Sequence, residues 1–504
     1  MVSSFCWSCL SRLRPTPRAL LPPPPPSAAP RTAAACFHTS TPRYANPTKK
    51  KANSVEMAKY RQAKSARMKK KKTVERPRPP AVGERKALRK RIVLSNTNAL
   101  EVQGMQDLSV ENMVDWRLRG SVLGLPVAML DQLRAVQAFK PTQGWSIFRR
   151  PGTVMRKETL EMARMFESID TEGADKGKVF KRVITGTRGT GKSVHLLQAM
   201  AMGFLKKWVV ITVPETQDLV IAHTAYAPLP DSQPTQYVQN NATADLLNRT
   251  VTANKEVLSG LHISQNHPAL QSLLRPKMTL EDLARLGVQD PTIAWPVFQA
   301  LWSELTATSP AVNETQFKPR PPMVVTVDGL AHWMMDSKYR SAEFEPIHAH
   351  DLVLVKHFLS LLKPGGAQPS LPNGGLLLYS TSASNNPTVY TFNVALKQLE
   401  ARQAGVDPSS PDFPQPEPYR PIDERVLKLF DGAKPTSPKE GALELQTLGG
   451  LTKDEARGFM EYFARSGILR ERVTEEWVGE KWSLAGGGVI GELEKLGRRV
   501  RTMA

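Results

Sequence analysis

The segment Val183–Met200, V-I-T-G-T-R-G-T-G-K-S-V-H-L-L-Q-A-M, contains a glycine-rich loop whose residue types suit phosphate binding. Residues 186–193 fit the P-loop pattern G-x-x-x-x-G-K-[ST]. Glycines let the backbone turn so that its amide groups face inward, and the N-terminus of a following helix adds partial positive charge. The predicted nucleotide-binding residues of this loop are Gly186, Thr187, Arg188, Gly189, Thr190, Gly191, Lys192 and Ser193.

Three side chains have the chemistry that a magnesium-bound nucleotide requires. Lys192 would reach the β- and γ-phosphates, and the Ser193 hydroxyl would ligate Mg²⁺. Asp328 ends the apolar run M-V-V-T-V-D, where it could hold the magnesium through water. We therefore predict Ser193 and Asp328 as the metal-binding residues. The alternative for Asp328 is a capping role at a turn, beside Gly329.

The residues after Asp328 lack the groups that usually activate water. An ATPase of the AAA+ type usually has glutamate at the next position, where this chain has Gly329. A Ras-like GTPase would show D-x-x-G, but position 331 is alanine, and it would show N-K-x-D, but the N-K pair at 254–255 is followed by E-V. We expect nucleotide binding with weak or no GTPase activity, and a base from elsewhere in the fold stays an open alternative.

A further polar group follows the fourth predicted strand. Ser380, Thr381 and Ser382 lie where P-loop proteins often place a polar residue facing the γ-phosphate, so Ser380 joins the predicted nucleotide-binding residues. The nine histidines show no metal-ligand spacing. We expect His195 and His332 to be structural.

Alternating strands and helices must position these groups. Continuous apolar runs predict buried parallel strands, and 3.6-residue periodicity predicts helices between them. The predicted strands are Val183–Thr185, Trp208–Val213, Met323–Asp328 and Gly375–Ser380. The predicted helices are Met155–Ile169, Val194–Leu205, His350–Leu362 and about 241–261, 279–287 and 293–306, with a loop at 214–240. This pattern indicates an α/β fold with a parallel sheet flanked by helices.

The chain divides by composition around this nucleotide-binding domain, which we place at 151–407. Residues 92–150 are a lead-in segment, and 408–421, with six prolines among fourteen residues, predict a linker. The C-terminal domain at 422–504 is predicted to be winged-helix-like. Its expected elements are helices at Ile422–Phe430, Thr452–Ser466 and Ile490–Val500, and a hairpin of Ile468–Val473 with Lys481–Leu484.

The N-terminal 91 residues carry almost all of the net charge. They hold 23 Lys+Arg against 3 Asp+Glu, whereas the rest of the chain is nearly neutral. Residues 1–45 are Arg-rich, Ser-rich and free of acids, which predicts a mitochondrial presequence. Residues 46–91 are predicted to be a disordered basic arm. The arm has one aromatic residue, which favours binding to the backbone of structured nucleic acid. No run approaches the ~18 apolar residues of a membrane span.

Several longer segments, between about 140 and 500, resemble the death-associated-protein-three family of mitochondrial small-subunit ribosomal proteins, in its fungal form. The matching segments are F-R-R-P-G-T-V-M-R-K-E-T-L-E from Phe148, G-T-R-G-T-G-K-S, W-V-V-I-T-V-P-E-T-Q-D-L-V at Trp208–Val220, A-Y-A-P-L-P at Ala225–Pro230, V-V-T-V-D-G at Val324–Gly329 and L-T-K-D-E-A-R-G-F-M-E-Y-F-A-R-S-G at Leu451–Gly467. The segment Ala485–Leu493 lacks the Pro-Arg pair of some relatives, so no sensor arginine is carried over to it.

The resemblance implies a P-loop NTPase fold related to AAA+ and STAND proteins. It implies a place in the head of the mitochondrial small subunit, in the matrix, in contact with ribosomal RNA, neighbouring proteins and the large subunit. It also implies bound GTP or GDP with Mg²⁺, although the residues alone do not exclude ATP. Two alternatives stay open: an active NTPase in ribosome assembly, and a mitochondrial nucleic-acid-binding regulator outside the ribosome.

Overall fold

The computed structural model describes residues 92–498, with gaps at 174, 312–316, 364–368, 383–386 and 432–436. The predicted presequence (1–45), the basic arm (46–91) and the last two residues of the predicted C-terminal helix lie outside the described residues. The predictions for those segments therefore stay predictions.

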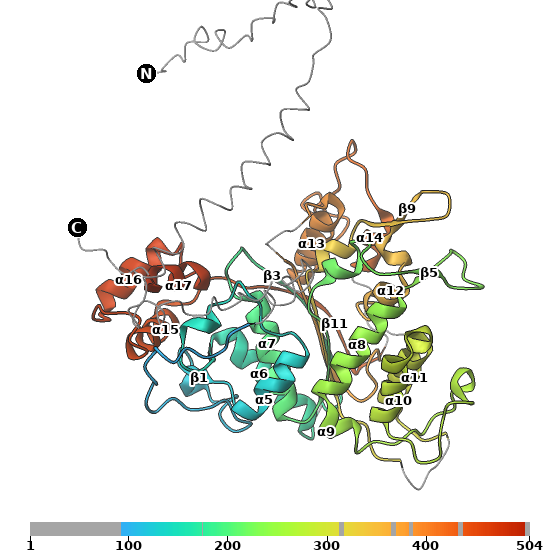
Figure 1. The fold of residues 1–504 in the computed structure, drawn as a ribbon. Helices are drawn as coiled ribbons and strands as arrows, with labels where there is room; N and C mark the ends of the chain where they lie inside the picture. Colours follow the sequence, from blue (N-terminus) through green and yellow to red (C-terminus); the bar gives the residue numbers. More distant parts are fainter. Residues whose placement is uncertain are drawn as a thin grey trace, which may run out of the picture. The chain divides into compact units, whose positions relative to one another are not determined.

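A five-stranded sheet lies at the centre of the described residues (Figure 1). Its strand order is β11-β3-β10-β7-β4. The strands are β3 (Val179–Thr185), β4 (Val209–Val213), β7 (Met323–Asp328), β10 (Gly375–Ser380) and β11 (Glu440–Thr447). All neighbouring pairs are parallel, so the carboxyl ends of the strands meet at one edge. Ser380 pairs in register with Ile184 on one side and Asp328 on the other, which brings three predicted site segments together. The predicted α/β fold with a parallel sheet is confirmed.

Strand β11 was not predicted from the sequence. It lies at the edge of the sheet beside β3, and its apolar Leu443 and Leu445 alternate with Glu444 and Gln446. The two leucines pack against the core, while Glu444 forms an ion pair with Arg182 at 2.9 Å. An edge strand with one solvated face lacks the continuous buried run of β4, β7 and β10, so its signal in the sequence is weaker.

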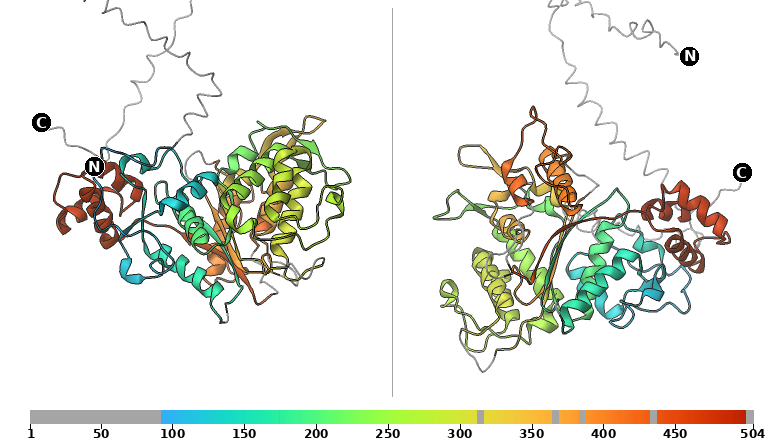
Figure 2. Two further views of the ribbon diagram at one scale, coloured as in Figure 1. Left: turned by 60° about the horizontal axis from the view of Figure 1, so that its bottom comes forward. Right: turned by 180° about the vertical axis from the view of Figure 1, so that it is seen from behind.

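Helices cover both faces of the sheet (Figure 2). On β10, Leu376 and Leu378 face one core cluster, while Leu377 and Tyr379 face the other, because successive side chains of a strand alternate. The first cluster includes α5 (Val127–Ala135), α6 (Lys157–Asp170) and α7 (Lys192–Leu205). The second includes α8 (Asn240–Ala253), α9 (Lys255–Leu258), α10 (Leu280–Gln289), α11 (Ala294–Thr306), α12 (Val353–Ser360), α13 (Tyr390–Gln403) and α14 (Glu424–Leu429).

Within the part of the chain that the structure describes, three antiparallel strand pairs lie outside the main sheet. They are β1 (Val122–Gly124) with β2 (Gly152–Val154), β5 (Ala227–Pro228) with β6 (Tyr237–Val238), and β8 (Asp336–Arg340) with β9 (Pro346–His348). The loop predicted at 214–240 therefore contains one short strand pair.

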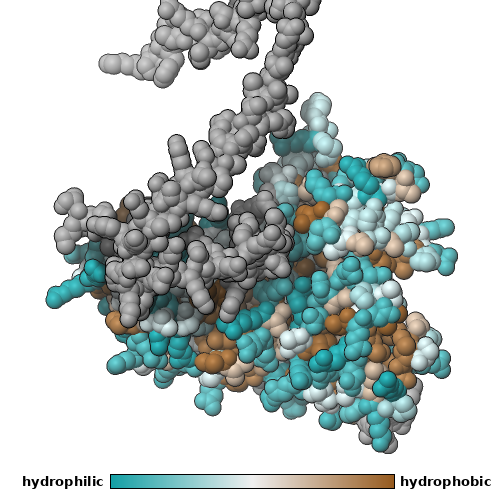
Figure 3. Space-filling view, viewed as in Figure 1, coloured by the Kyte–Doolittle hydropathy of each residue, from teal (hydrophilic) through white to brown (hydrophobic). Residues whose placement is uncertain are grey.

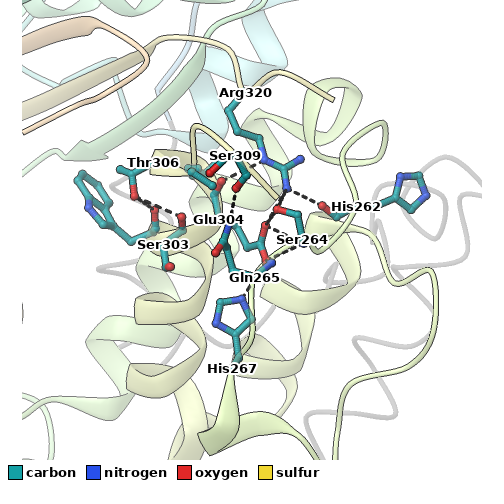
Figure 4. Close-up of polar contacts among 12 residues, drawn as sticks. His262, Ser264, Gln265, His267, Ser303, Glu304, Thr306, Ser309 and Arg320 are labelled. Carbon is teal, nitrogen blue, oxygen red and sulfur yellow. Dashed lines mark hydrogen bonds and ion pairs between the residues drawn. The ribbon is translucent and has the colours of Figure 1, made fainter. Parts of the chain in front are cut away.

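A buried polar cluster anchors the segment that leads into β7 (Figure 4). The Glu304 carboxylate on α11 forms an ion pair with Arg320 at 2.7 Å, and both side chains are fully buried. The carboxylate also accepts hydrogen bonds from the backbone amides of Ser264 and Gln265 and contacts His267 at 3.0 Å. Because Arg320 lies three residues before β7, this cluster fixes the start of the strand that ends in Asp328.

The C-terminal helices differ from the predicted arrangement. Helix α15 (Lys453–Arg465) begins at Thr452 with a complete capping box, close to its predicted start. The predicted hairpin is wrong, because its second arm lies within α16 (Glu475–Leu484). Thr474 caps that helix by accepting from the Trp477 amide, and Val478 is buried in the same cluster as α15.

Helices α15, α16 and α17 (Ile490–Arg498) share a third core cluster with the lead-in segment. The cluster includes Phe148 of the lead-in segment and Val154 of β2, and the Phe148 and Phe463 rings are 4.9 Å apart in an edge-to-face arrangement. The C-terminal segment therefore lacks the hairpin that a winged helix would have at 468–484. The residues beyond the proline-rich stretch contribute strand β11 to the main sheet and a separate cluster of helices.

Candidate nucleotide-binding site

The predicted phosphate-binding residues form a tight loop between β3 and α7, which we call the glycine loop (residues 186–191). Gly186, Gly189 and Gly191 have φ angles of 143°, 88° and 93°, in the region that favours glycine. A Cβ at Gly186 would lie 2.4 Å from the Leu448 carbonyl oxygen, so no other residue fits there without movement. Gly191 directly precedes the first turn of α7, whose N-terminus faces the loop. The predicted strand and helix that flank this loop are confirmed.

Lys192 lies inside the loop, with 7% of its surface exposed. Its ammonium group donates to the carbonyl oxygens of Gly186 and Thr187, at 2.6 and 2.9 Å. Burial lowers the pKa of the ammonium group, and the nearby Asp328 carboxylate opposes that shift. In this position the Lys192 ammonium group could bind an anion together with the backbone amides of the loop.

The carboxylate of Asp328 collects polar groups from separate elements. Its Oδ2 accepts from the Ser193 hydroxyl at 2.7 Å, and its Oδ1 accepts from the buried Ser380 hydroxyl. The Lys140 ammonium group, from the lead-in segment, also donates to Oδ2. Asp328 is only 8% exposed. The three predicted residues Ser193, Asp328 and Ser380 are thus brought into contact, together with a lysine that was not predicted.

Gly329 occupies a place where a side chain does not fit. Its φ is +100°, and a Cβ there would lie 2.7 Å from Oγ1 of Thr216. The Thr216 hydroxyl donates to the Gly329 carbonyl, and the Gly329 amide donates to the Ser380 carbonyl at 2.9 Å. Glycine at position 329 is therefore required by the backbone conformation and by the neighbouring Thr216 side chain.

Comparisons with known proteins identify the family. A sequence profile of the family described as mitochondrial ribosomal death-associated protein 3 matches residues 153–496. The small ribosomal subunit protein mS29 of Neurospora crassa is 42% identical over 428 residues, which are 85% of this chain and 85% of that protein. This chain belongs to the mitochondrial ribosomal death-associated protein 3 family. The predicted family and the predicted mitochondrial location are confirmed.

In this member of the death-associated protein 3 family, a buried arginine forms a hydrogen bond with the backbone of the glycine loop. Arg156 is 3% exposed and donates to the carbonyls of Thr190, at 3.0 Å, and Gly449, at 3.2 Å. Its Nε donates to Glu158 at 2.7 Å. The residue stands within the segment from Phe148 that carries the family resemblance, but the sequence alone gives no sign of its contact with the loop.

The C-terminal segment of the family member also reaches the glycine loop. The Gly491 amide donates to the Gly189 carbonyl at 2.9 Å. Val489 and Ile490 lie so close to Gly189 and Gly191 that a Cβ on either glycine would be 3.2 Å from them. The segment without a sensor arginine therefore touches the loop through its backbone and apolar side chains.

The two histidines expected to be structural lie near the site without meeting it. His195 is buried on α7, and its Nδ1 lies 3.3 Å from the Gln198 side-chain oxygen. Burial and the nearby Arg156 lower the pKa of His195 to about 4, and burial also lowers the pKa of His332. Both rings are therefore neutral at physiological pH. Among the described residues, no group of three or more His, Cys, Asp or Glu side chains could hold a metal ion.

Proposed function

We propose that this chain is a structural protein of the mitochondrial small ribosomal subunit that holds a guanine nucleotide with Mg²⁺ as a fixed part of its fold. The similarity to mS29 supports the ribosomal role. The glycine loop and the contact of Ser193 with Asp328 support the nucleotide site. Gly329 is the observation that favours nucleotide binding over nucleotide hydrolysis, because the fold excludes a side chain at the position where an ATPase has its glutamate.

The residues present fit a magnesium-bound nucleotide. Lys192 and the glycine loop supply the donors for phosphate oxygens, and the loop's left-handed glycines let the backbone approach them. Ser193 and Asp328 supply hydroxyl and carboxylate oxygens, the ligand types that Mg²⁺ prefers. When bound, the ion would neutralise phosphate charge, and Ser380 would orient Asp328. The choice of guanine rests on the family resemblance.

The finer fold assignment belongs to the same proposal. We infer that the sheet is of the AAA+ and STAND-like P-loop type. Support comes from the strand order, in which β10 separates the glycine-loop strand β3 from the Asp328 strand β7 and places Ser380 between them.

A bound nucleotide has a physical use without turnover. A ligand that binds only the folded chain stabilises it by about 4 kcal/mol at a thousand-fold excess over its dissociation constant. The glycine loop contacts the sheet, the Arg156 side chain and the C-terminal segment. A ligand on the loop would therefore stabilise the junction of these three parts.

The basic arm is the proposed contact with ribosomal RNA. Residues 49–91 hold 18 Lys+Arg against three Glu, which suits phosphate binding with a strong salt dependence. The described residues on the face in Figure 3 are mainly hydrophilic, with apolar side chains in scattered groups. None of the described helices is long and apolar enough to cross a membrane. We propose that the folded part of the chain, residues 92–498, contacts ribosomal proteins and, at the subunit interface, the large subunit.

Sedimentation tests the ribosomal role. A tagged full-length chain, expressed in its native organism, should migrate with small-subunit RNA when a mitochondrial lysate is run on a sucrose gradient. Crosslinking should recover ribosomal RNA through the arm. A chain that sediments free of the small subunit, or that crosslinks to mitochondrial DNA or messenger RNA instead, would overturn the proposal in favour of a regulator outside the ribosome.

Nucleotide content tests the site. Denaturing the purified chain should release GTP or GDP, and Lys192→Met should abolish that release. Lys206→Met is a matched control, because Lys206 pairs with Asp170 at 2.7 Å at the other end of α7. Release of ATP instead, or equal release from both variants, would contradict the assignment.

An active NTPase acting in ribosome assembly is the second candidate, favoured by the intact contact of Ser193 with Asp328. Turnover well above ~0.01 s⁻¹, the rate of a slow GTPase, would support it. The proposed structural role predicts turnover below that rate.

A further inference from the structure

We propose that Lys140 is an internal counter-cation of the nucleotide site, which competes with Mg²⁺ for Asp328 and makes nucleotide retention only weakly dependent on magnesium. This inference rests on the proposed nucleotide binding. It assigns a role to a residue that precedes the part of the chain matched by the family profile, residues 153–496.

Lys140 is held against Asp328 by more than one contact. Its ammonium group donates to Oδ2 of Asp328 and to the carbonyl of Pro214, the latter at 3.1 Å. The Lys140 side chain is 22% exposed and the Asp328 side chain 8%. An ion pair this far removed from water is screened less than a surface pair, so it has a real effect on the charge of the site.

The backbone that carries Lys140 is anchored on both sides. Phe139 is buried, and its ring meets the Trp145 ring edge-on at 5.1 Å. The Lys140 amide donates to the Gln143 side-chain oxygen at 2.8 Å, and the Trp145 indole donates to the same oxygen at 2.5 Å. The ammonium group is therefore delivered to Asp328 from a fixed position, which reduces the entropy lost in forming the pair.

The charges of the site explain why such a cation matters. A carboxylate beside a row of nucleotide phosphates repels them unless a cation neutralises it. A bound Mg²⁺ would do this at the Asp328 carboxylate, and the Lys140 ammonium group does it at Oδ2, which also accepts from Ser193. Two cations at one carboxylate repel each other, so Lys140 would weaken Mg²⁺ binding. It also keeps Asp328 neutralised when magnesium is removed.

Titration of the full chain with a fluorescent GDP analogue, in millimolar Mg²⁺ and in excess EDTA, tests this role. For the wild type, EDTA should raise the dissociation constant less than about threefold. For Lys140→Met it should raise it about tenfold or more, and half-saturation of the complex should need less Mg²⁺ than in the wild type.

Three further variants separate this role from a folding effect. Lys140→Arg keeps the charge and should behave as the wild type. Lys206→Met removes a lysine–aspartate pair at the other end of α7 and should leave the response to EDTA unchanged. In the double variant Lys140→Met with Asp328→Asn no carboxylate needs neutralising, so the EDTA effect should fall again below about threefold.

The outcomes distinguish this inference from the proposed function. Equal EDTA sensitivity of the wild type and Lys140→Met overturns the role of Lys140 and leaves nucleotide binding standing. Absence of analogue binding to the wild type in both conditions overturns the proposed function and this inference with it.

Discussion

Replacement of Gly329 by alanine tests whether the fold excludes a side chain at the position after Asp328. The left-handed backbone costs an L-residue about 1–2 kcal/mol. The new Cβ would also lie 2.7 Å from the Thr216 hydroxyl, which is buried, and such overpacking costs about 1–3 kcal/mol more. We therefore expect Gly329→Ala to lower the free energy of unfolding by about 2–5 kcal/mol. That is a large part of the stability of an ordinary domain.

A matched glycine separates the two parts of this cost. Gly405 has a similar φ of +83°, but no atom lies within 4 Å of a Cβ built there. In urea denaturation, Gly405→Ala should show the backbone cost of about 1–2 kcal/mol alone. Adding Thr216→Ala to Gly329→Ala should recover part of the loss, because the hydroxyl that meets the Cβ is gone. The reasoning is refuted if Gly329→Ala destabilises no more than Gly405→Ala, or if Gly329→Glu folds normally and accelerates hydrolysis.

Three further changes test the supports of the site. Arg156→Met should weaken binding of a GDP analogue about tenfold or more in a fluorescence titration, because Thr190 of the glycine loop loses its buried charged donor; unchanged affinity would contradict this. Glu304→Gln should cost about 3–5 kcal/mol in urea denaturation, since it leaves a buried guanidinium without its anion, whereas Glu424→Gln at an exposed pair should have little effect. Burial raises the pKa of Glu304, but the hydrogen bonds that its carboxylate accepts together lower the pKa by more than burial raises it, so the net shift is downward. Its stabilisation is therefore present above the ordinary value of 4.5 and is lost as the pH falls through the lowered folded value, so the difference between wild type and Glu304→Gln should shrink in acid. Thr452→Ala removes a helix cap and should cost about 1 kcal/mol in the same assay; no change would mean that the cap contributes nothing.

Local signals in the sequence predicted much of the fold. The four predicted strands are found as β3, β4, β7 and β10, although β3 begins four residues before its predicted start, and Thr279 and Thr452 cap α10 and α15. Where two local signals compete, prediction failed. Lys481–Leu484, K-W-S-L, alternates as a strand does, but the helix start T-E-E-W at Thr474 and the burial of Val478 against α15 decide for a helix.

The candidate site could be predicted only as far as its sequence patterns extend. The glycine loop and Asp328 carry patterns of spacing and strand position, and parallel pairing then places Ser380 beside them. Lys140 and Arg156 carry no such pattern, because their role depends on contacts with residues 188 and 34 positions away along the chain. A single lysine or arginine in a sequence has no property that reveals such a partner.

The contacts around Asp328 bear on the proposed role of the site, which is to hold a nucleotide. Each oxygen of the carboxylate already receives a hydroxyl, from Ser193 or Ser380, and Lys140 adds a positive charge to one of them. As a hydrogen-bond acceptor at the end of β7, Asp328 connects this strand to α7, β10 and the lead-in segment. A ligand bound on the glycine loop would add to that same junction, so its binding energy would be used for stability and assembly.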